Sequence, residues 1–194
     1  MTFDPSAAFR RDLATWISTR RRPSASAATK LVVANPGVQA VLLLRAQMAL
    51  QAAGRHRLAR AASLHSLRIA GAQLLIGCRV GPGLRLPHPH RVVIGVGAVT
   101  DENWIILQRV TSGERCGDCA DPRHGYPRLG ARMVVGAGAA ILGGVRVGDD
   151  AVVGANALVV PDVDAADVVV GVPARSTKKA GGAGQPHAVQ SGQR

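Results

Sequence analysis

A six-residue repeat in the second half of the chain constrains the fold more than any other feature. Aliphatic residues recur there without a miss at Leu129, Val135, Ile141, Val147, Val153 and Val159. Four residues after each of them comes another apolar, mostly small residue, as at Met133 and Ala139. This period fits neither a helix nor an alternating strand. It predicts a three-sided prism of short parallel strands with about eighteen residues per coil.

Stacking of the coils follows from that period. Residues one coil apart should lie one strand spacing, about 4.8 Å, from each other and fill the interior with an aliphatic ladder. Glycine follows four of the six repeated residues, and we expect it at corners that need a positive φ. The expected stacked pairs are Leu129 with Val147, Val135 with Val153, and Ile141 with Val159.

The repeat continues upstream more loosely. Val80 and Leu86 are six residues apart, and the phase then slips by two in the stretch 88–92 before the repeat resumes at Ile94. A polar, glycine-rich break at 112–127 predicts an extended loop that leaves the prism.

The N-terminal third has helical patterns instead. Apolar residues from Phe3 to Ile17 fall at helical spacing, and a basic, Ser/Ala-rich linker is expected from Thr19 to Lys30. Residues 38–67 are rich in Ala, Leu, Gln and Arg and predict two helices joined near Gly54. The predicted organisation is a helical segment at 1–70, basic and partly flexible over 1–30, a strand domain at 71–175, and a basic, disordered tail at 176–194.

The net charge of +12 is unevenly distributed. Residues 1–70 carry +9 and residues 174–194 carry +4, whereas residues 71–173 carry −1. Aromatic residues make up only 3% of the chain, so few side chains could stack on bases, and we expect no nucleic-acid partner. Three cysteines make no disulfide framework, and no apolar stretch is long enough to span a bilayer. We therefore expect a cytoplasmic protein without a membrane span.

Five stretches follow the order and spacing of one known family: 106–113 (ILQRVTSG), a loop ending in Arg123-His124, 135–143 (VGAGAAILG), 153–160 (VGANALVV) and 171–175 (GVPAR). With these, the chain resembles the hexapeptide-repeat acyltransferases, and within them the serine acetyltransferases, from about Asn35 to Arg175. The resemblance implies a mainly β fold, a left-handed parallel β-helix preceded by a small α-helical N-terminal segment.

The resemblance also implies an activity and an assembly. The activity is acetyl-CoA-dependent O-acetyl transfer from the donor to L-serine, giving O-acetyl-L-serine for cysteine biosynthesis. The assembly is a homotrimer, with a dimer of trimers as the larger form, and each site lies between adjacent chains. Enzymes of this type often dock a C-terminal isoleucine into the sulfhydrylase that uses their product. This chain ends in Arg194, whose charge an apolar pocket would bury unpaired, so we expect no stable sulfhydrylase complex.

Acetyl transfer needs a base that removes a hydroxyl proton near neutral pH, and histidine, with a reference pKa of about 6.5, suits that task. Within the resemblance His88 matches the family's catalytic base, and His124 matches its second histidine. Arg123 matches the residue that pairs with the amino acid's carboxylate through two parallel hydrogen bonds. Gln73 stands where the family has an acidic partner for the base, and Pro87 stands where it has Asp before the histidine.

These two departures bear on the acceptor. Gln73 can accept a hydrogen bond from the imidazole and fix its tautomer, but it cannot stabilise the imidazolium as a carboxylate does. Either Asp118 or Asp121 of the loop replaces the missing acidic partner, or the base works without one. Pro87 removes a contact to a substrate ammonium group. The hydroxyl of a sugar or a secondary metabolite is therefore the alternative acceptor.

Acetyl-CoA is the implied co-substrate, bound in a shallow groove along the coils. Small residues there would let the pantetheine arm lie against backbone, and Lys178 and Lys179 could meet the nucleotide phosphates, unless they belong to a solvated tail. The expected contacts are Gly113, Gly136, Ala137, Gly154, Ala155 and Lys178.

Two other classes of function stay open at this point. Cys116 and Cys119 could form a redox pair or hold zinc together with His124. His88, His90 and His124 could also hold zinc, as in β-helical carbonic anhydrases. We expect no metal, since a lone C-x-x-C in a loop is a weak signal. The other class is a scaffold without catalytic activity that binds CoA or a partner.

Overall fold

The computed structural model describes residues 4–17, 25–115 and 125–178, and its helices precede its strands in the chain. Asp4 caps the first helix and Asn35 the third, each accepting hydrogen bonds from two backbone N–H groups of the first turn. A proline follows each cap, where a missing N–H costs nothing. The helices are α1 (Pro5–Ala14), α2 (Ala25–Ala34), α3 (Pro36–Ala52) and α4 (His56–Ala70).

Both helices predicted between 38 and 67 are confirmed as α3 and α4, and the chain turns between them at Gly54, whose φ is +71°. The linker expected up to Lys30 is wrong in its second half, because α2 begins at Ala25. The α2 sequence contains four alanines and neither glycine nor proline, and this helix packs on α3. The alanines from which a linker was expected are helix formers, and here they belong to a helix.

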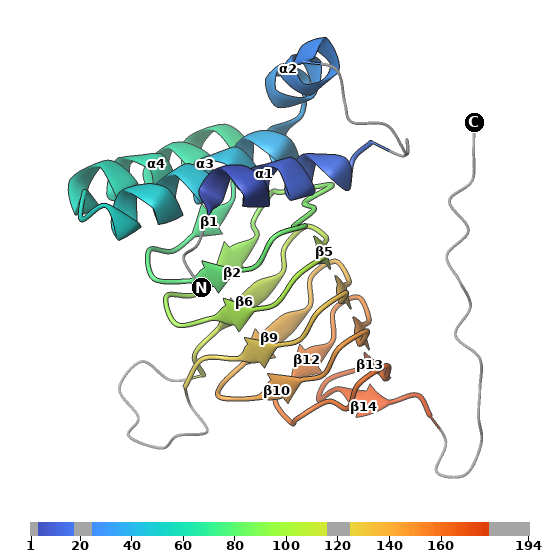
Figure 1. The fold of residues 1–194 in the computed structure, drawn as a ribbon. Coiled ribbons are helices and arrows are strands. Elements are labelled where there is room, and N and C mark those ends of the chain that lie inside the picture. Colours follow the sequence, from blue (N-terminus) through green and yellow to red (C-terminus); the bar gives the residue numbers. More distant parts are fainter. Residues whose placement is uncertain (1–3, 18–24, 116–124, 179–194) are drawn as a thin grey trace.

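Helices α1, α3 and α4 form a layer across one end of the strand region, and α2 packs on α3 on the side away from the strands (Figure 1). In that layer α3 packs between α1 and α4, and α4 contacts the first strand. Among the described helices, none combines the length and the apolar character that crossing a membrane requires.

The strands make three sheets, which we call sheets A, B and C, and all paired strands are parallel except the last pair. Sheet A contains β1 (Gln73–Leu74), β3 (Val93–Ile94), β6 (Thr111–Gly113), β9 (Ala140–Leu142) and β12 (Leu158–Val159). Sheet B contains β2 (Arg79–Val80), β4 (Val99–Thr100), β7 (Arg128–Leu129) and β10 (Arg146–Val147). Sheet C contains β5 (Ile105–Ile106), β8 (Val134–Val135), β11 (Val152–Val153), β13 (Val168–Val170) and β14 (Arg175–Ser176).

From β3 to β12, successive strands belong to sheets A, B and C in turn, so the chain winds into a prism, as the six-residue repeat predicts. The three stacked pairs expected from that repeat are confirmed: Leu129 with Val147, Val135 with Val153, and Ile141 with Val159. The upstream phase slip is also confirmed, because Gln73 pairs with Val93, twenty residues later, whereas Val93 pairs with Thr111, eighteen later. The two extra residues lengthen the corner that contains His88.

One polar residue interrupts the interior ladder of sheet A. Ser112 lies between Ile94 and Ile141 in register, and it is 3% exposed. Its hydroxyl has no hydrogen-bond partner among the described residues. The prediction that the extended loop begins at 112 is therefore wrong by two residues, since Ser112 and Gly113 belong to β6.

The role expected for the repeat glycines is also wrong. Gly136 and Gly154, which follow Val135 and Val153, do not have a positive φ; the left-handed residues lie two positions later, at Gly138 and Asn156. A Cβ on Gly136 would lie 2.5 Å from the backbone nitrogen of Ala155 on the next coil. Close stacking of the coils, rather than a left-handed backbone, requires glycine at these positions.

A buried ion pair fixes the helical layer to the first coil. Arg45 of α3 donates two hydrogen bonds to Asp12 of α1, at 2.8 and 3.0 Å, and both side chains are 2% exposed. The Asp12 carboxylate also accepts from the backbone N–H groups of Gly83 (2.7 Å) and Leu84 (2.9 Å). Arg45 in turn donates to the carbonyl oxygen of Gly81 at 2.7 Å. One carboxylate and one guanidinium thus connect two helices with the prism.

Candidate active site

His88 lies on a corner of the prism between sheet C and sheet A. It follows Arg85, which bridges to Ile105 of sheet C, and it precedes β3 of sheet A. The side chain of His88 is exposed. Proline on both sides restricts the backbone, because Pro87 and Pro89 each fix φ. The sequence thus presents the imidazole to solvent on a stiff turn.

Backbone hydrogen bonds attach this corner to the coils before and after it. The N–H of Arg91, a residue with φ of +59°, donates to the carbonyl oxygen of Gly71 at 2.8 Å. The N–H of Arg109 donates to the carbonyl oxygen of His90 at 3.0 Å. Gly71 is left-handed at the end of α4, and a Cβ there would lie 3.0 Å from Nδ1 of His90. The position of the corner is therefore set from both sides.

Gln73 lies in β1, beside the strand that follows the His88 corner. Its backbone N–H donates to the carbonyl oxygen of Val92 at 2.8 Å, and its side chain is half-buried. Within the described residues, no hydrogen bond joins the side chains of Gln73 and His88. The structure brings the two residues to neighbouring coils of the same sheet edge and leaves the contact between them unmade.

The Gln73 side chain lines a cavity of about 310 Å³ between α4 and the first coils. Most of its lining is aliphatic, and its one charged residue is Arg60. Ser63 of α4 holds the helix to this wall by donating to the carbonyl oxygen of Leu74 at 2.8 Å. The other lining residues are Leu64, Leu67, Leu75, Ile76 and Val96.

The small residues predicted to contact acetyl-CoA lie at two edges of sheet A. Gly136, Ala137, Gly154 and Ala155 follow β8 and β11, in the sheet C to sheet A corners two and three coils after the corner that carries His88. Backbone hydrogen bonds continue along this edge, where Asn156 N–H donates to the carbonyl oxygen of Ala137 at 2.8 Å.

Gly113 lies at the opposite edge, where β6 ends. A Cβ added to Gly113 would meet no atom within 4 Å, so the space beside it is open. Within one chain the predicted contacts are therefore divided between the two edges of sheet A. A ligand that touches all of them has to cross the sheet or bridge two chains.

Lys178 lies beyond β14 and already has an acidic neighbour. Its Nζ is 3.9 Å from Oδ1 of Asp167, and its side chain is half exposed. Asp167 also accepts a hydrogen bond from the Ser176 hydroxyl at 2.8 Å. Lys179, the other predicted phosphate contact, lies outside the described residues.

Several other predicted residues also lie outside the described part of the chain: Cys116, Asp118, Cys119, Asp121, Arg123 and His124. Within residues 4–17, 25–115 and 125–178, no group of three or more His, Cys, Asp or Glu side chains is placed to hold a metal. Cys78 is buried there, and loss of solvent raises the pKa of its thiol to about 12.

The sequence reasoning missed Tyr126, which returns the extended loop to the prism. Its ring covers Gly95 and Gly97, and a Cβ on either glycine would collide with it. Desolvation and then a hydrogen bond to Glu114 raise the pKa of the Tyr126 phenol. The two ends of the loop are thus joined over sheet A. In the sequence, the only indication of this contact is that the one tyrosine of the chain follows a Gly-x-Gly stretch, Gly95 to Gly97, by one coil and the extended loop.

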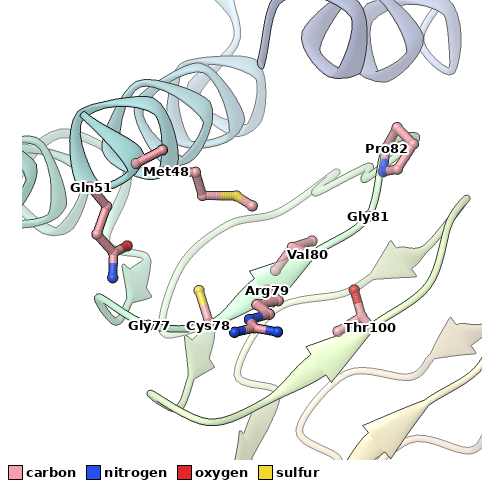
Figure 2. Close-up of a pocket in the computed structure, with 10 residues that line it drawn as sticks. Met48, Gln51, Gly77, Cys78, Arg79, Val80, Gly81, Pro82 and Thr100 are labelled. Carbon is pink, nitrogen blue, oxygen red and sulfur yellow. The ribbon is translucent and has the colours of Figure 1, made fainter. Parts of the chain in front are cut away.

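A second and larger cavity, of about 690 Å³, lies under α3 on the side of sheet B (Figure 2). Met48 and Gln51 of α3 face Cys78 and Val80 across it, and Arg79 lies at its floor. None of the residues predicted for the active site lines this cavity. No sequence pattern indicated it, because it depends on how α3 packs on β2.

Comparison with known proteins bears on what this arrangement does. No family model matches the chain. It is 36% identical over 157 residues to a serine acetyltransferase of Helicobacter pylori strain J99, covering 81% of this chain and 90% of that protein. It is 37% identical over 153 residues to a serine acetyltransferase of Mycobacterium tuberculosis, covering 79% of this chain and 66% of that protein.

Solved structures agree with these relatives. The serine acetyltransferase of Neisseria gonorrhoeae superposes with a TM-score of 0.78 at 31% identity, over 89% of this chain and 67% of that chain. Soybean serine acetyltransferase, solved as a complex with serine, superposes with a TM-score of 0.77 at 31% identity, over 89% of this chain and 70% of that chain.

Proposed function

Because the chain belongs to the serine acetyltransferase family, whose members are acyltransferases, we propose that it transfers the acetyl group of acetyl-CoA to the hydroxyl of L-serine. The observation that carries this proposal is the 36% identity with the Helicobacter protein over 90% of that protein's length. The products are O-acetyl-L-serine and free CoA. The reaction belongs to cysteine biosynthesis, and the proposed location is the cytoplasm.

The proposed base is His88. Its neutral imidazole accepts the proton of the serine hydroxyl as the oxygen attacks the thioester carbonyl carbon. The C–S bond then breaks, and the imidazolium returns the proton to the departing CoA sulfur. Support for this role comes from the exposed position of His88 on a corner that hydrogen bonds fix from both sides. A base held in place loses less entropy on the way to the transition state.

Gln73 is proposed to orient the imidazole, by accepting a hydrogen bond from its second ring nitrogen. The half-buried side chain lies one coil from the His88 corner, which is compatible with that bond. Pro87 stiffens the backbone before His88 and lines the acceptor site. Arg123 and His124 are proposed to bind the serine carboxylate and to complete the site; both lie outside the described residues.

Acetyl-CoA is proposed to lie along the prism edge that carries Gly136, Ala137, Gly154 and Ala155, with its thioester toward His88. The proposed assembly is a homotrimer of left-handed prisms in which one chain offers this edge and its neighbour offers the Gly113 edge. The division of the predicted contacts between two edges of sheet A supports a shared site. Lys178 would leave Asp167 to meet a phosphate of the donor.

The function is tested by release of free CoA from acetyl-CoA with L-serine as acceptor. We expect release that depends on L-serine and yields O-acetyl-L-serine by mass spectrometry. CoA release that is the same with and without L-serine would refute the proposal. A mixture of His88→Ala and His124→Ala chains tests the shared site, because one intact site per mixed interface should restore part of the activity.

Two residues favour a second acceptor class. Gln73 and Pro87 stand where the family has acidic residues, and Pro87 removes a contact to the ammonium group of serine. The hydroxyl of a sugar or a secondary metabolite is therefore the second candidate. A panel of such acceptors, compared with L-serine by kcat/KM in the same assay, distinguishes the two.

A further inference from the structure

The aromatic ring of Tyr126 rests on the turn that follows β3. The three atoms nearest to a Cβ on Gly97 would all belong to this ring, and a Cβ on Gly95 would lie 2.9 Å from its Cε1. Neither glycine has a positive φ, so the backbone conformation alone does not require glycine at these positions. At Gly97 it is the ring that leaves no room for a side chain.

The same ring lies beside Gly113, which we expect to contact acetyl-CoA. The Cα of Gly113 lies 3.1 Å, and Cε1 of Tyr126 2.9 Å, from the place that a Cβ on Gly95 would take. The N–H of Gly95 donates to the carbonyl oxygen of Ser112 at 2.7 Å, which joins this turn to β6. A Cβ on Gly113 itself would meet no atom within 4 Å. Tyr126 and Gly113 are therefore neighbours on one edge of sheet A, next to open space.

The phenol of Tyr126 holds the residue that follows Gly113. It donates a hydrogen bond to the side chain of Glu114, and desolvation, followed by this bond, raises the pKa of the phenol. A phenol with a raised pKa stays protonated at neutral pH, so it remains a donor. Glu114 is exposed, and Tyr126 is only partly buried and does not belong to the hydrophobic core. The contact therefore fixes a surface edge of the prism rather than its interior.

We propose that Tyr126 is a positioning residue for the acetyl donor. Through its ring on Gly97 and its hydrogen bond to Glu114, it holds the Gly113 edge in the position that acetyl-CoA binds. This role rests on the proposed function, which places the donor between the Gly113 edge of one chain and the Gly136 edge of its neighbour. An edge that is already in place loses less conformational entropy on binding, so the affinity for the donor is higher.

The alternative is that Tyr126 only fills space. A phenylalanine has the same ring and would fill that space equally well, so it would leave donor affinity unchanged. Tyr126→Phe removes the phenol oxygen alone and therefore separates the two roles. Because the residue lies at the surface, its Tm should stay within about 3 °C of wild type in either case.

The test is the Kd of acetyl-CoA, measured by isothermal titration calorimetry on the full chain. Tyr126→Phe and Glu114→Ala should each weaken binding about fivefold, the factor that corresponds to one ordinary hydrogen bond. The double variant should lose the same factor rather than the product, because both changes remove one bond. In L-serine-dependent CoA release, KM for acetyl-CoA should rise with Kd while kcat changes by less than about threefold.

The matched control is Glu114→Gln, which removes the charge and keeps an acceptor oxygen at the same place. It should bind acetyl-CoA within about twofold of wild type. An unchanged Kd in Tyr126→Phe, factors that multiply in the double variant, or equal weakening by Glu114→Gln and Glu114→Ala would each overturn the proposal.

The calorimetric readout needs no turnover, which separates this proposal from the proposed function. Wild-type protein that binds acetyl-CoA but releases no CoA with L-serine would refute the function and leave the role of Tyr126 to be decided by Kd. Wild-type protein without measurable affinity for acetyl-CoA would overturn the role of Tyr126 as well.

Discussion

Removing the Asp12 carboxylate should destabilise the protein far more than removing a surface charge. In Asp12→Ala the guanidinium of Arg45, 2% exposed, loses its counter-charge. The backbone N–H groups of Gly83 and Leu84, now 2.7 and 2.9 Å from the carboxylate, lose their acceptor. Breaking a buried pair by removing one partner costs about 3–5 kcal/mol. For a chain of this length that corresponds to a fall in Tm of roughly 10 °C.

The assay is equilibrium unfolding in urea, followed by circular dichroism, with two further variants. Arg11→Ala breaks the neighbouring ion pair with Glu102, whose side chains are 52% and 40% exposed, and should cost less than about 1 kcal/mol. Asp12→Leu/Arg45→Met removes both charges and should recover the part of the loss that comes from the unpaired guanidinium. It should not recover the part that comes from the N–H groups of Gly83 and Leu84, which lack an acceptor in this variant too. An Asp12→Ala protein within about 1 kcal/mol of wild type would refute the reasoning.

Three further outcomes are expected. Gly136→Ala should lower Tm, because its Cβ would lie 2.5 Å from the backbone nitrogen of Ala155. Gly113→Ala should leave Tm unchanged, because no atom lies within 4 Å of the added Cβ. Equal Tm values for the two variants would contradict the close-stacking account. Ser112→Ala should leave the free energy of unfolding in urea unchanged or raise it by about 1 kcal/mol, because it removes a buried hydroxyl without a hydrogen-bond partner among the described residues. A free energy of unfolding that falls by more than about 1 kcal/mol would show that the hydroxyl makes a hydrogen bond. The Cys78 thiol, with a pKa of about 12, should be ionised in on the order of one molecule in ten thousand at pH 8. Its alkylation, followed by peptide mass spectrometry, should therefore be slow in the folded protein. The rate should increase as the pH rises towards 12, and it should become fast on unfolding.

The strand region was predictable because its pattern is local and repeated. The six-residue period identified the interior residues and their partners, and the two-residue slip located the longer corner that carries His88. Helix α2 was missed because alanine and serine occur both in linkers and in helices, and packing on α3 decides between them.

The contacts that hold the parts together left no such pattern. Asp12 and Arg45 are 33 residues apart, and neither belongs to a motif that predicts the other. The role of the repeat glycines depends on the distance between coils, which the sequence does not contain. Tyr126 and both cavities likewise follow from side-chain packing between distant segments. The role of His88 was predicted from a family resemblance and stays a prediction, whereas the hydrogen bonds that fix its corner became visible only in the structure.

The central claim is that His88 is the base in acetyl transfer to serine. The most direct test is kcat for L-serine-dependent CoA release, measured for wild type and for His88→Ala, with acetyl-CoA binding measured separately. The account predicts that kcat falls by about 10²–10⁴ while acetyl-CoA affinity changes by less than about threefold. A His88→Ala enzyme whose kcat stays within about tenfold of wild type would contradict it.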